Sequence, residues 1–263
     1  MEKLFVIKIG GNIIDNDDAL TRFLHTLASI EERFILVHGG GKIASTLGQS
    51  MGIEPVMVQG RRVTDERTLD LVTMVYAGLI NKKIVARLQA LNRNAVGLTG
   101  ADGNILPALK RPVKEVDFGL VGDPIAEETG SEFIQHLLDS GMLPVIAPIT
   151  HNKAGQLLNT NADTIASVLA VALSKHYSVR LVYCFEKQGV LDDIANETSV
   201  IQLITTTEFE KLKKENKLAD GILPKLDNAF DALRAGVHEV LIGHAGDIAR
   251  NCTGHTAGTL IRL

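Results

Sequence analysis

The order of apolar and amphipathic segments constrains the fold of this chain more than any other sequence feature. Short apolar runs with strand character, such as residues 4–9, 34–37 and 179–184, alternate with runs of helical periodicity, such as 17–30 and 162–175. Strands that alternate with helices are typical of α/β proteins, because parallel strands are joined by helical crossovers. The pattern therefore predicts an α/β fold with a largely parallel sheet.

The remaining segments fit the same pattern. Residues 54–63 are expected to form a hairpin with its turn at Gly60, and Thr64 is expected to cap the helix that follows. The best candidate for a boundary between two lobes is 174–179, after the long apolar helix. The helix capped at Thr64 and a successor are expected to run to about Asn92. Further helices are expected at 42–51, 131–139, 206–214 and 226–235, and further strands at 95–99, 143–147, 237–242 and 259–262.

Composition excludes several classes of protein. The 263 residues are 45% hydrophobic and carry a formal net charge of −4, which does not favour binding to nucleic acid or to an anionic membrane. No apolar run reaches 18 residues, and the N-terminus lacks the features of a signal peptide. Cys184 and Cys252 have no metal-ligand spacing and are expected to be free thiols. We expect a cytoplasmic protein with no membrane or nucleic-acid partner.

A glycine-rich segment, FILVHGGGKIAS at 34–45, suggests a site for an anion. It is not a Walker A loop, because that motif would need glycine at Leu36 and a hydroxyl residue at Ile43. The spacing G-x-G-x-x-A over 39–44 fits the dinucleotide fingerprint, and Asp65 supplies an acid roughly 20 residues later. On the motif alone, binding of NAD stays open.

Lys8 interrupts an apolar strand. Alternation places Leu4, Val6 and Lys8 on one face of that strand, and strands of a parallel sheet are buried on both faces. The ammonium therefore needs a partner, or it is an edge lysine that extends to water. Its place at the carboxyl end of the strand, directly before Gly10 and Gly11, favours a ligand-binding role.

A second lysine lies at the start of a predicted helix. Pro224 is favoured at the first helical position, which places Lys225 in the first turn, where the helix dipole opposes a cation. A bound anion would make this position favourable. A solvated surface lysine is an equally good interpretation of Lys225 on this argument alone.

The segment NTNAD at 159–163 precedes the long apolar helix. Asn161 as the cap and Asp163 in the first turn are a sufficient structural account of these two residues. Asn159 lies outside the helix and has no evident structural role. Arg62 could bind a carboxylate through two parallel hydrogen bonds, although a lone arginine is more often a surface residue.

These motifs together resemble the amino acid kinase family and, within it, the N-acetylglutamate kinases. The resemblance covers almost the whole chain, and it rests on the order and spacing of the motifs. They are IKIGG at 7–11, VHGGGK at 37–42, GRRVT at 60–64, GLTGADG at 97–103, QLLNTNAD at 156–163, ADGILPKLDNA at 219–229 and GTLI at 258–261. The resemblance implies a three-layer αβα sandwich with an open, mainly parallel central sheet and two lobes. Residues 1–176 would bind the acyl amino acid and form the dimer contact, and 177–263 would bind the nucleotide.

The resemblance also implies a role for each matched residue. Lys8 and Lys225 would be the catalytic cations, and Asp163 would order both. Matches to the site for the acylated amino acid are Gly40, Gly41, Arg62 and Asn159. Matches to the nucleotide site are Gly10, Gly11, Gly189, Leu191, Lys217 and Gly221.

The activity implied is transfer of the γ-phosphoryl group of ATP, with Mg²⁺, to the side-chain carboxylate of N-acetyl-L-glutamate in arginine biosynthesis. Another acyl group, such as N-succinyl, stays open, as does a non-catalytic nucleotide- or NAD-binding sensor. A homodimer that arginine does not inhibit is expected, because the first strand begins almost at the N-terminus. The chain departs from the family at VYCFEKQG, 182–189, where the bulky Phe185 and the charged Glu186 and Lys187 occur.

Overall fold

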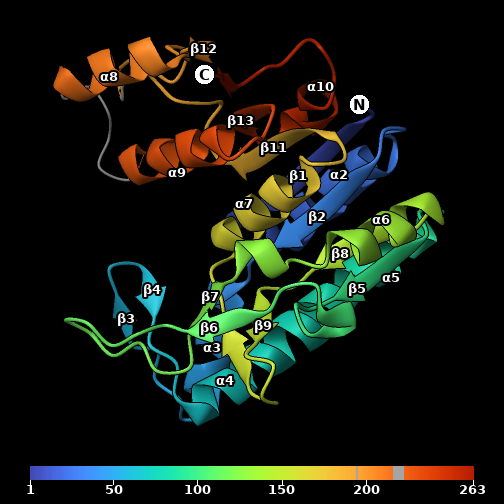
Figure 1. Ribbon diagram of the computed structural model, residues 1–263, viewed down its shortest axis with the longest axis vertical. Coiled ribbons are helices and arrows are strands. Elements are labelled where there is room, and N and C mark those ends of the chain that lie inside the picture. The colour runs from blue at the N-terminus through green and yellow to red at the C-terminus, as the bar shows by residue number, and fades with distance from the viewer. Residues whose placement is uncertain (194, 216–221) are drawn as a thin grey trace.

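The computed structural model describes residues 1–193, 195–215 and 222–263. Within them, an eight-stranded sheet in the order β12-β14-β13-β11-β1-β2-β8-β5 runs through the middle of the molecule (Figure 1). All neighbouring strands are parallel except β13 and β14, which pair antiparallel. The strands are β1 (Lys3–Ile9), β2 (Phe34–His38), β5 (Ala95–Leu98), β8 (Leu143–Ile146), β11 (Ser178–Phe185), β12 (Leu203–Ile204), β13 (Glu239–His244) and β14 (Thr259–Ile261).

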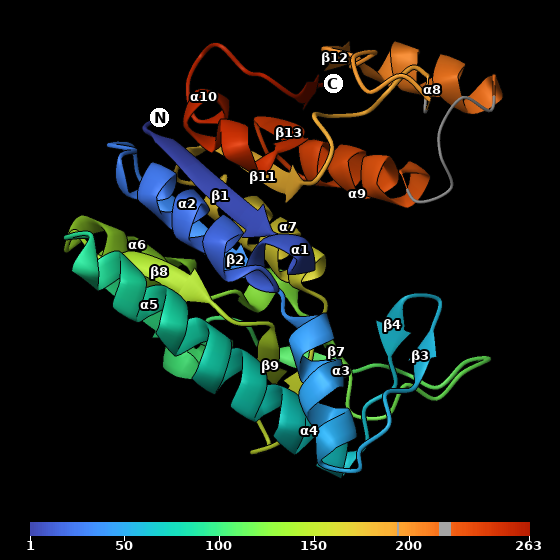
Figure 2. The same cartoon turned by 180° about the vertical axis from the view of Figure 1, so that it is seen from behind.

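Helices cover both faces of this sheet, which gives the expected three layers (Figures 1 and 2). One buried apolar cluster joins the sheet to α6 (Ser131–Asp139), α7 (Ala162–Leu173), α8 (Thr206–Lys214) and α9 (Leu223–Arg234). The cluster on the other face joins it to α1 (Gly11–Ile14), α2 (Asp17–Ala28), α3 (Gly41–Ser50), α4 (Glu66–Thr73), α5 (Asn81–Ala90) and α10 (Ile248–Asn251). No described helix is both long enough and apolar enough to cross a membrane.

Strand β1 shows why the sequence forms this arrangement. Leu4 and Val6 belong to the apolar cluster of α7 and α9, whereas Phe5, Ile7 and Ile9 belong to the opposite cluster. A strand between two layers of helices needs apolar residues at nearly every position. The predicted alternation is confirmed, and it directs the side chain of Lys8 toward the α7 layer.

Three short antiparallel pairs lie beyond the carboxyl ends of β2, β8 and β5 (Figures 1 and 2). They are β3 (Met57–Val58) with β4 (Arg61–Arg62), β6 (Ala108–Lys110) with β7 (Gly122–Pro124), and β9 (Ile149–His151) with β10 (Leu157–Asn159). The first pair is the predicted hairpin, and Gly60 in its turn has a φ of 74°. These pairs form walls around the end of the sheet.

The helical segment over 64–92, expected as a helix and its successor, needs two corrections. Its cap is Asp65 and not Thr64, because the Asp65 side chain accepts a hydrogen bond from the amide of Thr68. Its middle is a π-helix, η1 (Met74–Ile80), between α4 and α5. Short 3₁₀ turns occur at η2 (Asp102–Asn104), η3 (Ala126–Glu128) and η4 (Ala245–Asp247).

An ionic cluster joins β11, β13 and the C-terminal segment. Arg180 and Glu239 are opposite each other in register and are less than 10% exposed. Arg180 Nε donates to Glu239 Oε1 at 2.6 Å, its Nη1 donates to the carbonyl oxygens of Asn251 and Thr253, and Arg262 Nη2 donates to Glu239 Oε2 at 2.7 Å. Burial opposes ionisation of Glu239, but the hydrogen bonds from Arg262 and Arg180 outweigh it and lower its pKa.

Candidate active site

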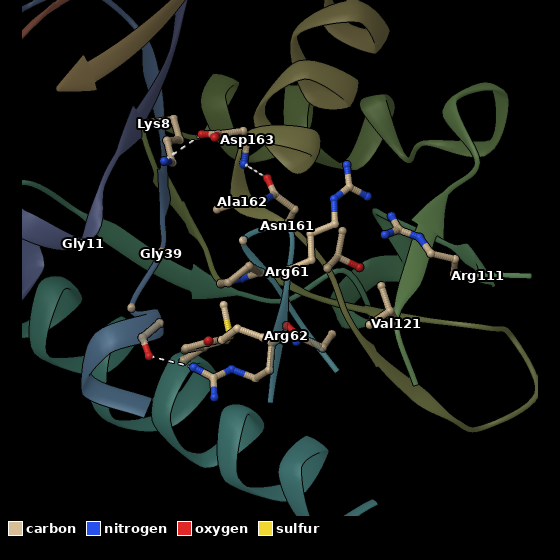
Figure 3. A pocket seen from close by; sticks show the side chains of 18 residues that line it. Lys8, Gly11, Gly39, Arg61, Arg62, Arg111, Val121, Asn161, Ala162 and Asp163 are labelled. Atoms are coloured by element: carbon tan, nitrogen blue, oxygen red, sulfur yellow. Dashed lines mark hydrogen bonds and ion pairs between the residues drawn. The ribbon is translucent and has the colours of Figure 1, made fainter. Parts of the chain in front are cut away.

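Two cavities meet at the carboxyl end of β1, and both are lined by Lys8 and Gly11. The first, which we call the glycine-loop cavity, lies between residues 39–41, the β3–β4 hairpin and residues 159–163 (Figure 3). The second, the strand-end cavity, lies between residues 10–13, the end of β11 and the start of α9. Lys8 therefore faces two separate binding spaces.

Lys8 has the partner that its buried position requires. Its Nζ lies 2.7 Å from Asp163 Oδ1, and the Lys8 side chain is 12% exposed (Figure 3). Asp163 occupies the first turn of α7, whose cap Asn161 accepts hydrogen bonds from the amides of Asp163 and Thr164. The predicted cap is confirmed, and Asp163 has an ion pair in addition to its place in the first turn. A snorkelling edge lysine is excluded at position 8.

Lys225 joins this pair from a third element. It lies in the first turn of α9, as predicted, and its Nζ is 3.5 Å from the centre of the Phe185 ring. Burial lowers its pKa, the charge of Asp163 raises it, and the charge of Lys8 lowers it further. Lys225 lines the strand-end cavity, so the interpretation as a solvated surface lysine is wrong.

The glycine loop is shaped by the π-helix. Gly40 has a φ of 145°, and a Cβ atom there would lie 2.2 Å from Ile80 Cδ1 and 3.3 Å from the Tyr76 ring. Both contacts come from η1, so any side chain at Gly40 would be strained in conformation and blocked in space. The loop thus brings backbone atoms of Gly39, Gly40 and Gly41 directly to the cavity surface.

Arg62 is buried and not a surface residue. It is 7% exposed, and its Nη2 donates to the carbonyl oxygen of Gly41 and to Ser45 Oγ, both at 2.8 Å (Figure 3). These bonds tie the β3–β4 hairpin to the start of α3. The guanidinium lines the glycine-loop cavity, where its remaining N–H groups can meet an anion.

The buried side chain of His38 contacts the backbone of the same loop. Its Nδ1 lies 2.9 Å from the carbonyl oxygen of Gly39, and its Nε2 lies 3.2 Å from the amide nitrogen of Asn81. The neutral ring with its proton on Nδ1 satisfies both contacts. Burial lowers the pKa of His38 to about 4, against a smaller opposing effect of the Gly39 hydrogen bond. His38 is therefore neutral at pH 7, and both of its ring nitrogens already have partners.

Asn159 has a structural role that the sequence did not show. Its Nδ2 donates to Thr64 Oγ1 at 3.0 Å, and its backbone amide donates to the carbonyl oxygen of Leu120. It nevertheless lines the glycine-loop cavity with Asn161 and Asp163. The structure thus places all four expected acyl-amino-acid positions, Gly40, Gly41, Arg62 and Asn159, in one cavity.

Only some of the residues expected to bind the nucleotide line the strand-end cavity. Gly10, Gly11 and Gly189 line the strand-end cavity. Gly189 packs so closely on β14 that a Cβ atom there would lie 2.6 Å from Thr259 Oγ1. Leu191 is 8% exposed, bridges to Val200 and does not line the cavity. Lys217 and Gly221 lie outside the described residues.

Three lining residues were missed. Arg61 and Arg111 lie on the side of the glycine-loop cavity away from Lys8 (Figure 3), and Asp123 holds Arg111 through an ion pair. Tyr76 lines the same cavity from η1. Arg111 follows the short strand β6, and Tyr76 belongs to the apolar pattern of a helix, so neither carried a sequence signal.

The charge of the two cavities suits anionic ligands. The first cavity is lined by Lys8, Arg61, Arg62 and Arg111, with Asp163 paired to Lys8. The second is lined by Lys8, Lys187 and Lys225, with Glu186 as its acid. Among the described residues, no three His, Cys, Asp or Glu side chains come together as a metal site. The geometry fits two anions that meet at Lys8, one in each cavity.

Similarity to known proteins identifies the family of this chain. The model of the amino acid kinase family matches residues 3–244. The chain belongs to the amino acid kinase family. Proteins named acetylglutamate kinase are similar over nearly the whole chain: that of Cytophaga hutchinsonii is 54% identical over 93% of this chain and 92% of its own, and that of Bacteroides thetaiotaomicron is 51% identical over 95% and 96%. That of Methanopyrus kandleri is 39% identical over 90% of this chain and 93% of its own.

Solved structures show the fold of the amino acid kinase family in more distant proteins. N-acetylglutamate synthase from Neisseria gonorrhoeae, in complex with coenzyme A and N-acetyl-glutamate, superposes with a TM-score of 0.82 at 22% identity and covers 99% of this chain, which spans 59% of that one. Carbamate kinase from Giardia lamblia bound to AMP-PNP gives a TM-score of 0.71 at 17% identity and covers 99% of this chain and 98% of its own. The expected fold is confirmed.

Proposed function

We propose that this protein transfers the γ-phosphoryl group of ATP to the side-chain carboxylate of N-acetyl-L-glutamate, giving an acyl phosphate and ADP. The observation that carries the proposal is the group of Lys8, Asp163 and Lys225 at the junction of two cavities. The similar proteins named acetylglutamate kinase support the choice of acceptor. The reaction would belong to arginine biosynthesis.

The chemistry explains why the site needs cations and no general base. A side-chain carboxylate is ionised at neutral pH, so no proton has to be removed before it attacks. A carboxylate oxygen attacks the γ-phosphorus, the bond to the bridging oxygen breaks, and the electron pair leaves with ADP. The obstacle is the approach of one anion to another, and phosphoryl transfer is catalysed mainly by positioning and by neutralising charge.

Each charged residue then has a role. Lys8 faces both cavities and contacts the acceptor and the transferred group. Lys225 approaches the same group from the nucleotide side, and Asp163 holds Lys8 in place through the 2.7 Å ion pair. Mg²⁺ would enter with ATP, held largely by the nucleotide itself, and would neutralise part of the charge on its phosphates.

The glycine-loop cavity is assigned to the acyl amino acid. Backbone groups of Gly40 and Gly41 would contact it, and Arg62 and Asn159 would bind its polar groups. The strand-end cavity is assigned to ATP, with the amides near Gly10 and Gly11 facing phosphates and Gly189 close to the nucleoside. Residues 1–176 thus supply most of the acceptor site, and 177–263 complete the nucleotide site.

Trapping of the acyl phosphate as a hydroxamate tests this function. Purified protein is incubated with MgATP, hydroxylamine and one acceptor at a time: N-acetyl-L-glutamate, N-succinyl-L-glutamate, L-glutamate or L-aspartate. We expect product with N-acetyl-L-glutamate. Product with N-succinyl-L-glutamate alone would move the proposal to that acceptor, and product with none would contradict a kinase acting on these carboxylates.

Thermal unfolding separates the kinase from a sensor that binds NAD. MgATP is expected to raise Tm because it binds only the folded protein, and NADH is expected to leave Tm unchanged. The NAD interpretation rests only on the spacing of residues 39–44, and our proposal gives that loop to the acyl amino acid instead. Stabilisation by NADH and not by MgATP would favour the sensor.

The proposal includes a homodimer in the cytoplasm. The buried free thiols Cys184 and Cys252 are typical of a reducing compartment. Helix α3 packs against η1, and both expose apolar side chains: Leu47 is 36% exposed, Met74 54% and Leu79 39%. This surface is the proposed dimer contact. Met74→Glu should give a monomer in analytical ultracentrifugation, whereas Leu109→Glu, an exposed position on β6, should leave the dimer intact.

A further inference from the structure

Phe185, the last residue of β11, lies directly beneath the ammonium group of Lys225. The distance from Nζ to the ring centre is 3.5 Å, and both residues line the strand-end cavity. Phe185 packs against the apolar cluster of α7 and α9 together with Tyr183, which is opposite Lys8 in register. The ring is therefore on the same side of the sheet as the three charged groups of the proposed site.

This contact is much shorter than the other cation–ring contacts of the described residues. Those range from 5.4 Å for Arg93 over Phe34 to 6.0 Å for Arg234 over Phe230. An ammonium group is attracted to the face of an aromatic ring within about 6 Å of its centre, and more strongly when water is excluded. Lys225 is half-buried, and no described carboxylate lies within ion-pair distance of it.

We propose that Phe185 is a positioning residue for Lys225, whose ammonium group it holds at the junction of the two cavities. The proposal rests on the function proposed above, in which that ammonium group meets the γ-phosphate of ATP. The ring fixes one end of a side chain that otherwise has four rotatable bonds. Lys225 is then in place before the nucleotide arrives, and less of its conformational freedom is lost during the reaction.

An aromatic ring suits this task better than a carboxylate. An acid beside Lys225 would cancel its charge, and this ion pair would have to loosen before the lysine could bind phosphate. The ring attracts the cation through its quadrupole and adds no formal charge. Asp163, which is the nearest acid, is already paired with Lys8. The pair of lysines thus keeps a net positive charge for the transferred group.

Substitutions at position 185 test the proposal with hydroxamate formation as the assay. Phe185→Leu keeps an apolar side chain but removes the ring face, and we expect kcat to fall about 5- to 30-fold. The KM for the acyl amino acid should stay unchanged, since the glycine-loop cavity does not include Phe185. Phe185→Tyr keeps the ring face and should restore kcat to within about twofold of the original protein.

The pH dependence of kcat gives a second measure that packing alone would not move. The ring stabilises the charged form of Lys225, so in Phe185→Leu the alkaline limb of the kcat profile should shift to lower pH. The other charged groups that face this ammonium are Asp163 on α7 and Lys8 on β1, and Glu186 and Lys187 line the same cavity. None of them is altered by the substitution, so the shift would report the ring.

Phe209→Leu is the matched control. The ring of Phe209 also contacts a cation, because Lys213 Nζ lies 5.5 Å from its centre. Phe209 is buried on α8 and lines neither cavity. This variant should lose thermal stability while its kcat and its alkaline limb stay unchanged. A Phe185→Leu variant that behaves in the same way would overturn the proposal, as would a Phe185→Tyr variant as slow as Phe185→Leu.

Chemical labelling of the unliganded protein tests positioning without the reaction. The pH dependence of Lys225 acetylation by acetic anhydride, read by mass spectrometry, reports the ionisation of this amine. We expect the midpoint to be lower in Phe185→Leu than in the original protein and unchanged in Phe209→Leu. If the midpoints behave in this way but the original protein forms no hydroxamate, the proposed function is contradicted and the contact between Phe185 and Lys225 is still supported. An unchanged midpoint in Phe185→Leu would overturn the contact itself.

Discussion

Lys8 lies where the two cavities meet, so one ammonium group can contact ligands bound in either cavity. Its position follows from strand geometry: alternation along β1 directs it to the α7 face, and the strand ends one residue later, at Ile9. The first turn of α7 then brings Asp163 to it, and α9 brings Lys225. Three elements far apart in sequence thus build one cationic centre.

Replacement of these lysines tests their part in phosphoryl transfer. Lys8→Ala and Lys225→Ala remove positive charge from the transferred group, and each should lower kcat by about 10²- to 10³-fold with a smaller effect on KM. Steady-state kinetics with N-acetyl-L-glutamate and MgATP measure this. Lys3→Ala, an exposed position on the same strand as Lys8, is the control and should leave kcat unchanged. Normal kcat in both site variants would exclude the proposed role.

Single-residue signals in the sequence favoured a ligand-binding role for Lys8 alone, and the roles expected of Asp163 and Lys225 came from the family resemblance. Lys8 was conspicuous because an apolar strand seldom contains a lysine, and Asp163 and Lys225 stood at recognisable helix starts. The contact of Lys225 with Phe185 depends on the fold bringing the first turn of α9 to the end of β11, and no spacing along the chain encodes this. Arg111 was hidden for the same reason, since it reaches the cavity only through the β6–β7 pair.

Helix boundaries were predictable where a cap and an apolar period agreed. Helices α6 and α8 have the bounds expected from the sequence. The start of α4 was misplaced by one residue, because Thr64 and Asp65 are both good caps and only the fold assigns the Thr64 hydroxyl to Arg62 and Asn159. The π-helix η1 could not be foreseen, because its apolar residues also fit an α-helical pattern.

Helix α7 is the element on which the charged centre depends most directly. Asn161 caps it and fixes the turn that carries Asp163. Asn161→Ala should lower the free energy of unfolding by about 1 kcal/mol and also lower kcat, because Asp163 would hold Lys8 less firmly. Chemical denaturation and kinetics measure the two effects.

Asn16→Ala is the matched variant for this helix cap. Asn16 caps α2 through the amide of Ala19, and it is exposed and outside both cavities. Asn16→Ala should lower the free energy of unfolding by about 1 kcal/mol, as Asn161→Ala does, and leave kcat unchanged. Equal kinetic losses in the two variants would show that kcat follows general stability, and the argument for α7 would fail.

Across the molecule, the sheet order could not be read from the sequence. Periodicity identified the strands, but the order β12-β14-β13-β11-β1-β2-β8-β5 depends on which crossovers pack on which face. The reversal of β14 is fixed by its pairing with β13 and by the Arg180, Glu239 and Arg262 cluster, whose members are 59 and 23 residues apart in sequence. Such long-range pairings leave no local signal.

Acid should destabilise the fold in two stages. The pKa of His38 is about 4 in the folded protein and 6.5 in the unfolded chain, so the unfolded chain binds the proton more readily. The contribution of His38 to the free energy of unfolding is fully present above pH 6.5. It is lost as the pH falls toward 4, by up to about 1.4 kcal/mol per pH unit. Glu239, whose pKa is lowered on folding, adds a further loss below its ordinary value of 4.5.

Urea unfolding at a series of pH values measures both stages. His38→Gln should remove the loss of unfolding free energy between pH 6.5 and 4 and keep the loss at lower pH. Glu239→Gln should keep the loss between pH 6.5 and 4 and remove the loss at lower pH, and it should be less stable at neutral pH. Both variants place an amide where the charge would change. A slope between pH 6.5 and 4 that persists in His38→Gln would assign it to other groups and contradict the burial argument.

The shared wall formed by Lys8 and Gly11 has a practical consequence for inhibitor design. A single compound that joins adenosine to an acylated glutamate through a chain of phosphates could occupy both cavities at once. Once one end is bound, the other is held at high effective concentration, so such a compound should bind far more tightly than either half. The linker length that binds most tightly would report the distance between the donor and acceptor atoms in the site.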